Sequence, residues 1–405
     1  MKKLMILGGT RYTIPVIKTA HKLGYYVITA DYCPNNVAHK YSDEYCNVSI
    51  IDKDSVLEAA IKLKIDGIMS FGCDPGVVTA AYVAEKLNLP SVGPYESVSI
   101  LQNKGKFRKF LRDNCFNVPT SNSYVDKGLA LNDIDKFNWP IIVKPTDSAG
   151  SKGVSRVDDP RELLIAIDFA LKYSHCKEFI IEDFLEKHGC SSDSDCFSVN
   201  GELKFVSFNS QLFDIESKNQ YVPSAFTWPS TFTVAQEKEL HSELQRLINL
   251  LGLKTSLYNV ESRVCTDGKA YIMECSPRGG NRLSELLKYA TGVDLIKASV
   301  LAAVGEPITE VKQNKYYGNW AETILHSYKD GIFEDISIDK SILGYVVEKD
   351  LWVKSGDYVS CFNGANDSIG TLVFKFDDDC TMKKVINNIG NYVKVKLKKC
   401  DTINR

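Results

Sequence analysis

The first hundred residues alternate short apolar runs with amphipathic stretches. Three apolar runs predict buried β-strands, at residues 4–7, 26–30 and 67–71. The amphipathic stretches between and after them predict helices, at residues 15–23, 55–63 and 77–87. Strand–helix alternation at this spacing is typical of a parallel sheet with helices on its faces. Ligands of such sheets gather at the carboxyl ends of the strands, which here carry Gly8-Gly9-Thr10, Asp31 and Gly72-Cys73-Asp74.

A second unit begins near residue 97 and mixes helical with strand patterns. Helices are predicted at residues 104–114, 161–173, 234–251 and 284–304, and strands at 141–144, 179–181, 257–265 and 269–275. Two small, polar segments, residues 147–153 and 189–195, are predicted to be loops. The last part of the chain is richer in short strands and turns, with strands predicted at 344–347, 353–362 and 370–376.

Composition narrows the class of protein. The 405 residues suffice for two to four domains, and 44% hydrophobic with 25% charged residues is ordinary for a globular protein. A net charge of -2 argues against a general nucleic-acid-binding surface. The N-terminal apolar run is too short for a signal peptide, and no stretch approaches a membrane span. The 12 scattered cysteines include no C-x-x-C pair, so we expect reduced thiols in a cytoplasmic protein.

The most specific chemical signal lies in a predicted hairpin. Its two strands flank Asp267-Gly268, a strong turn signal. If these two residues occupy the centre of a tight turn, Glu261 faces Glu274, with side chains about 5 Å apart. Two carboxylates at this distance repel each other unless a cation lies between them, and Mg²⁺ takes one or two carboxylates together with substrate phosphates. The alternative is a solvated pair of glutamates on an edge hairpin.

The residues after Glu274 support the metal interpretation. Ser276 lies two positions further along the strand, on the same face, and offers a third, neutral oxygen. Pro277 then ends the strand, and Arg278 follows. Arginine suits planar, bidentate binding of phosphate or carboxylate.

These segments resemble the ATP-grasp superfamily. N-V-E at 259–261, D-G-K at 267–269 and I-M-E-C-S-P-R at 272–278 are similar to its metal-binding hairpin, whose usual form is E-x-N-P-R. Ser276 stands where asparagine is commoner. L-G-G-T at 7–10, L-P-S-V-G-P at 89–94 and N-K at 103–104 resemble the domain that precedes ATP-grasp in the biotin-carboxylase-like branch, and residues 279–295 resemble carboxylate–amine ligases.

The resemblance extends over nearly the whole chain and implies an α/β and α+β protein in three parts. A Rossmann-like parallel-sheet (pre-ATP-grasp) domain is expected at residues 1–96. The ATP-grasp nucleotide-binding domain is expected at 97–310, with a first α+β lobe at 97–182 and a second at 183–310. A small α+β module is expected at 311–405.

The same resemblance implies nucleotide contacts. Two lysines of the family reach the phosphates of ATP, and Lys104 and Lys144 match them. Loop 147–153 is similar to the glycine-rich lid, with Ser151 and Lys152 as its phosphate contacts. The sequence E-D-F-L at 182–185 resembles the hinge that holds adenine, where Glu182 and Leu185 are the closest matches.

The implied enzyme is an ATP-dependent carboxylate–amine or amino-acid ligase that works through an acyl phosphate. Mg²⁺ (or Mn²⁺) is expected on Glu261, Glu274 and Ser276. Lys144 and Arg278 are expected to stabilise the developing charge, and Arg278, Asn281 and Arg282 to hold the substrate. The implied partners are a small carboxylate and an amine, without nucleic acid or membrane, and relatives are often homodimers.

Three other functions are also compatible with the sequence. A purine-pathway ligase of the glycinamide ribonucleotide synthetase type is the nearest alternative. A non-catalytic ATP-binding protein on the same fold is another, and Ser276 in place of asparagine favours it slightly. The third is a Rossmann oxidoreductase, suggested by Gly8-Gly9 and by Asp31 at a strand end, although the G-x-G-x-x-G fingerprint is incomplete.

Overall fold

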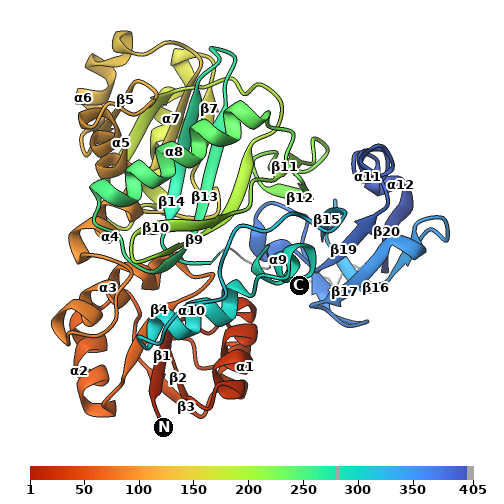
Figure 1. The fold of residues 1–405 in the computed structure, drawn as a ribbon. Helices are drawn as coiled ribbons and strands as arrows, with labels where there is room; N and C mark the ends of the chain where they lie inside the picture. Colours follow the sequence, from red (N-terminus) through yellow and green to blue (C-terminus); the bar gives the residue numbers. More distant parts are fainter. Residues whose placement is uncertain (280–282, 399–405) are drawn as a thin grey trace, which may run out of the picture.

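The computed structural model describes residues 1–279 and 283–398 of the chain. Within these residues the strands form five sheets, which Figure 1 shows as an N-terminal α/β part, two central lobes and a C-terminal part. No helix among the described residues combines the length and the apolar character that crossing a bilayer requires.

The N-terminal sheet is parallel and has the strand order β3-β2-β1-β4. Its strands are β1 (Lys3–Leu7), β2 (Tyr26–Asp31), β3 (Glu44–Asn47) and β4 (Gly67–Ser70). Its helices are α1 (Ile14–Lys22), α2 (Lys53–Leu63) and α3 (Val77–Lys86). The three predicted strands and helices are confirmed. The edge strand β3 escaped prediction because it is short, half-exposed and has no apolar run.

A helix from late in the chain completes this early domain. Met5 and Leu7 of β1 face α2 and α3, whereas Leu4 and Ile6 face α1 and α10 (Leu295–Ala303). The helix predicted at 284–304 is in fact two helices, α9 (Leu283–Thr291) and α10. Gly292 breaks it at a φ of +75°, and the carboxylate of Asp294 then caps α10.

The first central lobe is an antiparallel sheet of order β5-β8-β6-β7. Its strands are β5 (Ser121–Tyr124), β6 (Ile141–Pro145), β7 (Ser155–Val157) and β8 (Phe179–Asp183). Helices α5 (Lys104–Asp113), α6 (Lys127–Asn132) and α7 (Leu163–Tyr173) contact this sheet, and α4 (Tyr95–Gln102) packs between α3 and α5. Helix α7 packs on the apolar side chains of β6 and β8, which leaves the other face of these strands for the polar residues described below.

The second central lobe is a sheet of order β10-β9-β13-β14. Its strands are β9 (Ser192–Val199), β10 (Glu202–Val206), β13 (Ser256–Val264) and β14 (Ala270–Ser276). Helix α8 (Val234–Leu250) and the apolar side of α5 share one core with this sheet. The core takes alternate side chains of β13, such as Tyr258 and Val260, and so directs Glu261 to the opposite face.

The remaining strands come from residues 210–228 and from the last part of the chain, and they form two sheets. A five-stranded sheet has the order β11 (Ser210–Phe213), β12 (Pro223–Trp228), β15 (Asn319–Leu325), β19 (Gly370–Phe376) and β17 (Val346–Leu351). A three-stranded sheet has the order β18 (Tyr358–Val359), β16 (Gly331–Ile338) and β20 (Val393–Lys398), with α11 (Asp379–Ile386) and α12 (Ile389–Tyr392) nearby.

Two predicted C-terminal strands differ from the structure. The strand at 344–347 is wrong in its first half, because a 3-10 turn precedes β17. Of the strand at 353–362 only β18 forms. Asp357 closes a turn there by accepting a hydrogen bond from the backbone N–H of Lys354, and Gly356 adopts a φ of +99°.

Candidate active site

The hairpin of β13 and β14 brings Glu261 opposite Glu274, as predicted. The predicted two-residue turn is wrong, however. The N–H of Cys265 bonds to the carbonyl of Lys269 at 3.0 Å, so three residues form the loop, and Gly268 takes the left-handed position at a φ of +78°. This loop shifts the register by one residue from the predicted pairing.

A β-bulge cancels this shift. Ser262 pairs with Ile272 but Glu261 pairs with Glu274, so Met273 has no partner across the hairpin. The pattern of burial shows the same interruption. Ile272 and Cys275 are both buried in the core, although residues three positions apart on a regular strand point to opposite faces. The two glutamates therefore face each other because a longer turn and a bulge offset one another.

Asp193 adds a third carboxylate to the row. It lies on β9 directly opposite Glu261, on the side away from Glu274. Burial, with the nearby charges of Glu261 and Asp195, raises the pKa of Asp193 to about 8. The loop predicted at 189–195 is wrong from Ser192 onward, because β9 begins there. Its small polar side chains are buried in hydrogen bonds, such as that between the hydroxyls of Ser192 and Ser194 at 2.8 Å.

The oxygen atoms of this row suit a hard cation. In residues 1–279 and 283–398, no three or more His, Cys, Asp or Glu side chains converge at coordination distance. Magnesium needs only one or two protein carboxylates when phosphates supply the rest, which Glu261 and Glu274 satisfy. Gln211 lies beside them, with its amide nitrogen 3.5 Å from Glu261 and its amide oxygen buried without a hydrogen-bond partner. The residues present therefore fit Mg²⁺.

Lys104 lies between the carboxylate row and the glycine-bearing loop. Its ammonium group donates a 2.7 Å hydrogen bond to the carbonyl of Ser148 and lies 3.9 Å from a carboxylate oxygen of Glu274. The backbone N–H of Lys104 also bonds to the carbonyl of Thr146. The start of α5 thus places one cation at the point where loop and hairpin meet.

Lys144 and Glu182, both predicted as nucleotide contacts, form a buried ion pair at 2.7 Å. The guanidinium of Arg108 holds the other carboxylate oxygen of Glu182 at 2.8 Å. Burial alone would raise the pKa of Glu182, but Arg108 and Lys144 hold it at about 2. Burial lowers the pKa of Lys144. A lysine that ends an apolar strand needs a partner, and Glu182 supplies it. Arg108 was not among the predicted residues.

The other predicted nucleotide contacts lie around this centre. The hydroxyl of Ser151, at a φ of +57°, bonds to the carbonyl of Tyr221 at 3.1 Å. Lys152 is exposed, and Leu185 is half-buried just after β8. Glycine is favoured at position 153, because a Cβ there would lie 3.1 Å from the ring of Pro145.

Arg278 connects the hairpin to the N-terminal domain. Its guanidinium binds both carboxylate oxygens of Asp74 at 2.8 Å. Ser276 donates a 2.7 Å hydrogen bond to the same carboxylate and accepts one from Gln102, also at 2.7 Å. Burial raises the pKa of Asp74, but Arg278 outweighs it and the net pKa is lowered. Ser276, predicted as a metal ligand, thus has two protein partners here. Asn281 and Arg282, the other predicted substrate contacts, lie outside the described residues.

We expect Asp74→Asn to destabilise the protein by about 2–3 kcal/mol at pH 7, because it leaves the buried Arg278 without its counter-charge. A carboxylate whose folded pKa is depressed stabilises the folded state above its unfolded pKa of about 4, and this contribution is lost as the pH falls through the folded pKa. The difference between wild type and variant should therefore be full at pH 7 and shrink below about pH 4. Urea unfolding at both pH values measures it, and an equal difference at both would contradict this account.

Asp31 does not behave as the ribose-binding acid of a nicotinamide site. Its carboxylate accepts hydrogen bonds from the backbone N–H groups of Gly9 and Cys33, at 3.0 and 2.9 Å, and from the amide of Asn36 at 2.9 Å. These bonds tie down the loop after β1, and a Cβ on Gly9 would lie 2.3 Å from His39. The arrangement disfavours an oxidoreductase.

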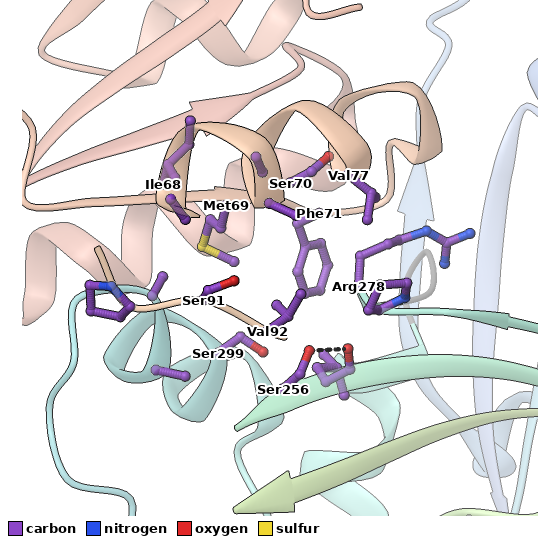
Figure 2. Close-up of a pocket in the computed structure, with 18 of the residues that line it drawn as sticks. Ile68, Met69, Ser70, Phe71, Val77, Ser91, Val92, Ser256, Arg278 and Ser299 are labelled. Atoms are coloured by element: carbon purple, nitrogen blue, oxygen red, sulfur yellow. Dashed lines mark hydrogen bonds between the residues drawn. The ribbon is translucent and has the colours of Figure 1, made fainter. Parts of the chain in front are cut away.

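A small cavity lies where the N-terminal domain, α10 and the hairpin meet (Figure 2). Phe71, Val92, Ser256 and Ser299 line it, and the stem of Arg278 closes one side while its guanidinium points away from Phe71. Its volume of about 50 Å³ accommodates a few water molecules. The cavity is therefore a gap at a joint and is far too small for a nucleotide.

The chain is similar to several known proteins. Residues 101–280 match the model of the ATP-grasp domain family. Over 327 residues the chain is 24% identical to the carbamoyl phosphate synthase large chain of Ralstonia nicotianae, which covers 76% of this chain but only 30% of that protein. The chain thus spans less than a third of the length of the synthase that it matches.

Solved structures extend the likeness to nearly the whole fold. The L-amino acid ligase from Bacillus licheniformis superposes with a TM-score of 0.80 at 20% identity, covering 98% of this chain and 99% of that one. Phosphoribosylglycinamide synthetase from Anaerococcus prevotii gives a TM-score of 0.77 at 22% identity, covering 98% and 100%. At these identities the likeness shows the fold alone. Together with the family match, it shows that the chain contains an ATP-grasp domain at residues 101–280 within a fold shared with these ligases.

Proposed function

We propose that the protein is an ATP-dependent carboxylate–amine ligase, of the amino-acid ligase kind, that joins two small molecules through an acyl phosphate. The observation that carries this proposal is the in-register pair Glu261 and Glu274, with the Lys104 ammonium 3.9 Å from the second carboxylate. Two anions and a cation at the mouth of a glycine-bearing loop suit a metal-bound polyphosphate.

In this proposal Glu261 and Glu274 hold Mg²⁺ (or Mn²⁺). When bound, the metal neutralises charge on the phosphate oxygens. Lys104 and Lys144 bind the phosphates, and the backbone at Ser151 and Lys152 closes over them. Lys144 and Arg108 both pair with the carboxylate of Glu182, so two basic side chains share one acidic side chain here.

The substrate side of the site is Arg278 with Asp74. Arg278 offers a positive charge to a carboxylate or to the phosphoryl group in transfer. Asp74 orients that guanidinium through two hydrogen bonds, and Ser276 fixes Asp74 in turn. We propose Asn281 and Arg282, which follow on the chain, as further substrate contacts.

The proposed reaction has two steps. An oxygen of the substrate carboxylate bonds to the γ-phosphorus of ATP, the bond to the bridging oxygen breaks, and ADP leaves. The amine nitrogen then bonds to the acyl carbon, phosphate leaves, and the nitrogen loses a proton. The protein contributes positioning and charge stabilisation and needs no nucleophilic side chain.

A second candidate is a ligase that joins phosphoribosylamine and glycine. The superposition on phosphoribosylglycinamide synthetase over 98% of this chain favours it. Both candidates share the nucleotide chemistry and differ only in the acid and amine.

A screen of paired acids and amines for ADP release tests the proposal. ADP should form only when one acid and one amine are present together. The identity of the pair that supports ADP release distinguishes the two candidate functions. Glycine with phosphoribosylamine is one arm, and pairs of amino acids are the others. Magnesium-dependent ATP binding without turnover on any pair would instead favour a non-catalytic ATP-binding protein.

A further inference from the structure

The hairpin contains a conflict of register that its bulge resolves. The three-residue loop pairs Ser262 with Ile272, and continued without interruption this register would place Met273 opposite Glu261. Glu274 would then alternate to the other face of β14, toward the apolar core that contains Val260. A charged side chain there is costly, and the pair of carboxylates would not form.

The bulge at Met273 leaves a backbone carbonyl free of the ladder. Arg108 takes this carbonyl, because its guanidinium nitrogen Nη1 donates a 2.8 Å hydrogen bond to it. The Nε atom of the same guanidinium lies 2.8 Å from Glu182 on β8. Arg108 is 1% exposed on α5, so its guanidinium makes both contacts from a buried position.

Arg108 thus joins three elements at one point: the helix that starts at Lys104, the strand that carries Glu182, and the bulge next to Glu274. The buried chain Lys144–Glu182–Arg108–Met273 runs from one lobe to the other without a gap. Its last link is the residue before Glu274.

We propose that Arg108 is a positioning residue for the metal carboxylates. Its guanidinium binds both the Met273 carbonyl and the Glu182 carboxylate, and so fixes the bulge that turns Glu274 toward Glu261. The inference rests on the proposed function, because it assumes that this pair binds the metal of a metal–nucleotide complex. Groups that orient metal ligands typically change metal affinity by about 10–100-fold when they are removed.

Lysine at position 108 separates this role from simple charge pairing. Its ammonium group keeps a positive charge beside Glu182, but it lacks the planar fork that reaches two acceptors in fixed directions. Arg108→Lys should therefore leave the chain folded and lose mainly the Met273 contact. Arg112→Lys is the matched control, since Arg112 lies one turn further along α5 and also bonds to a backbone carbonyl, that of Ser121 at 2.9 Å, away from the hairpin.

The test is a titration of the full chain with Mn²⁺ in the presence of ADP, followed by electron paramagnetic resonance. Arg108→Lys is expected to weaken Mn²⁺ binding by about tenfold or more, while ADP binding without metal changes less than about threefold and Arg112→Lys matches wild type. Mn²⁺ affinity equal to wild type in Arg108→Lys would overturn the inference. No Mn²⁺ binding by the wild-type ADP complex would instead overturn the proposed function.

Deletion of Met273 provides a second, independent readout. Without this residue, Ile272 and Glu274 still face Ser262 and Glu261, but in a regular ladder that needs no bulge. Arg108→Lys should then cost little further Mn²⁺ affinity in the chain that lacks Met273. An equal loss of about tenfold in both backgrounds would show that Arg108 acts through Glu182 alone and would contradict the proposal.

Discussion

Replacement of Glu274 by glutamine is expected to lower ADP formation by about 10²–10³-fold, because one preorganised charge at the reacting phosphates is lost. The amide keeps the shape of the side chain but cannot supply the negative charge that a metal requires. The rate of ADP formation with the acid and amine found by the screen measures the effect.

The same substitution should not harm the metal-free fold. Glu261 and Glu274 face each other across the hairpin, and like charges so placed are destabilising. Glu274→Gln removes this repulsion, so its thermal stability without metal should equal or exceed that of wild type. Glu202→Gln on β10 is the control, since Glu202 is exposed and forms a surface ion pair with Lys204. Full activity in Glu274→Gln would show that Glu274 is not a metal ligand.

Lys144→Met is expected to have the second largest effect, a loss of ADP formation of about 10²–10³-fold together with a loss of about 3 kcal/mol of stability. The stability falls because removal of one member of a buried ion pair leaves an under-compensated charge on Glu182. Urea unfolding and ADP formation measured on the same preparation report the two effects.

A triple substitution separates stability from chemistry. Glu182→Gln alone would leave the buried Arg108 without its counter-charge. Lys144→Met with Glu182→Gln and Arg108→Met removes all three charges of this buried group, so much of the lost stability should return. Activity should not return, because the phosphates still lack a cation. Recovery of activity along with stability would mean that Lys144 acts only as a structural partner of Glu182.

The sequence predicted much of the fold, and physical reasons explain where it did not. Strong apolar runs identified the N-terminal sheet, which lacked only the half-exposed strand β3. The covering helix α10 comes from more than two hundred residues later, and no local pattern assigns a helix to a distant sheet. Periodicity marked one helix at 284–304, but Gly292 ends it and Asp294 starts another.

The candidate site shows the same limit at smaller scale. The pairing of Glu261 with Glu274 was predicted from a two-residue turn that does not exist, and it holds because the bulge at Met273 offsets the longer turn. Asp193 escaped prediction because a run of small polar residues is typical of a loop. One signal for Arg108 was present in the sequence, since it lies among Phe107 and Leu111 on the buried side of its helix.

The most direct test of the account follows oxygen from the substrate carboxylate. With the acid labelled with ¹⁸O in its carboxylate, Mg-ATP and the amine that the screen identifies, one labelled oxygen should appear in the released phosphate. This transfer occurs because a carboxylate oxygen bonds to the γ-phosphorus in the first step. In the second step the amine displaces this oxygen from the acyl carbon, so the labelled oxygen leaves with the phosphate. Phosphate released without label, at a rate that matches formation of the joined product, would contradict an acyl-phosphate ligase.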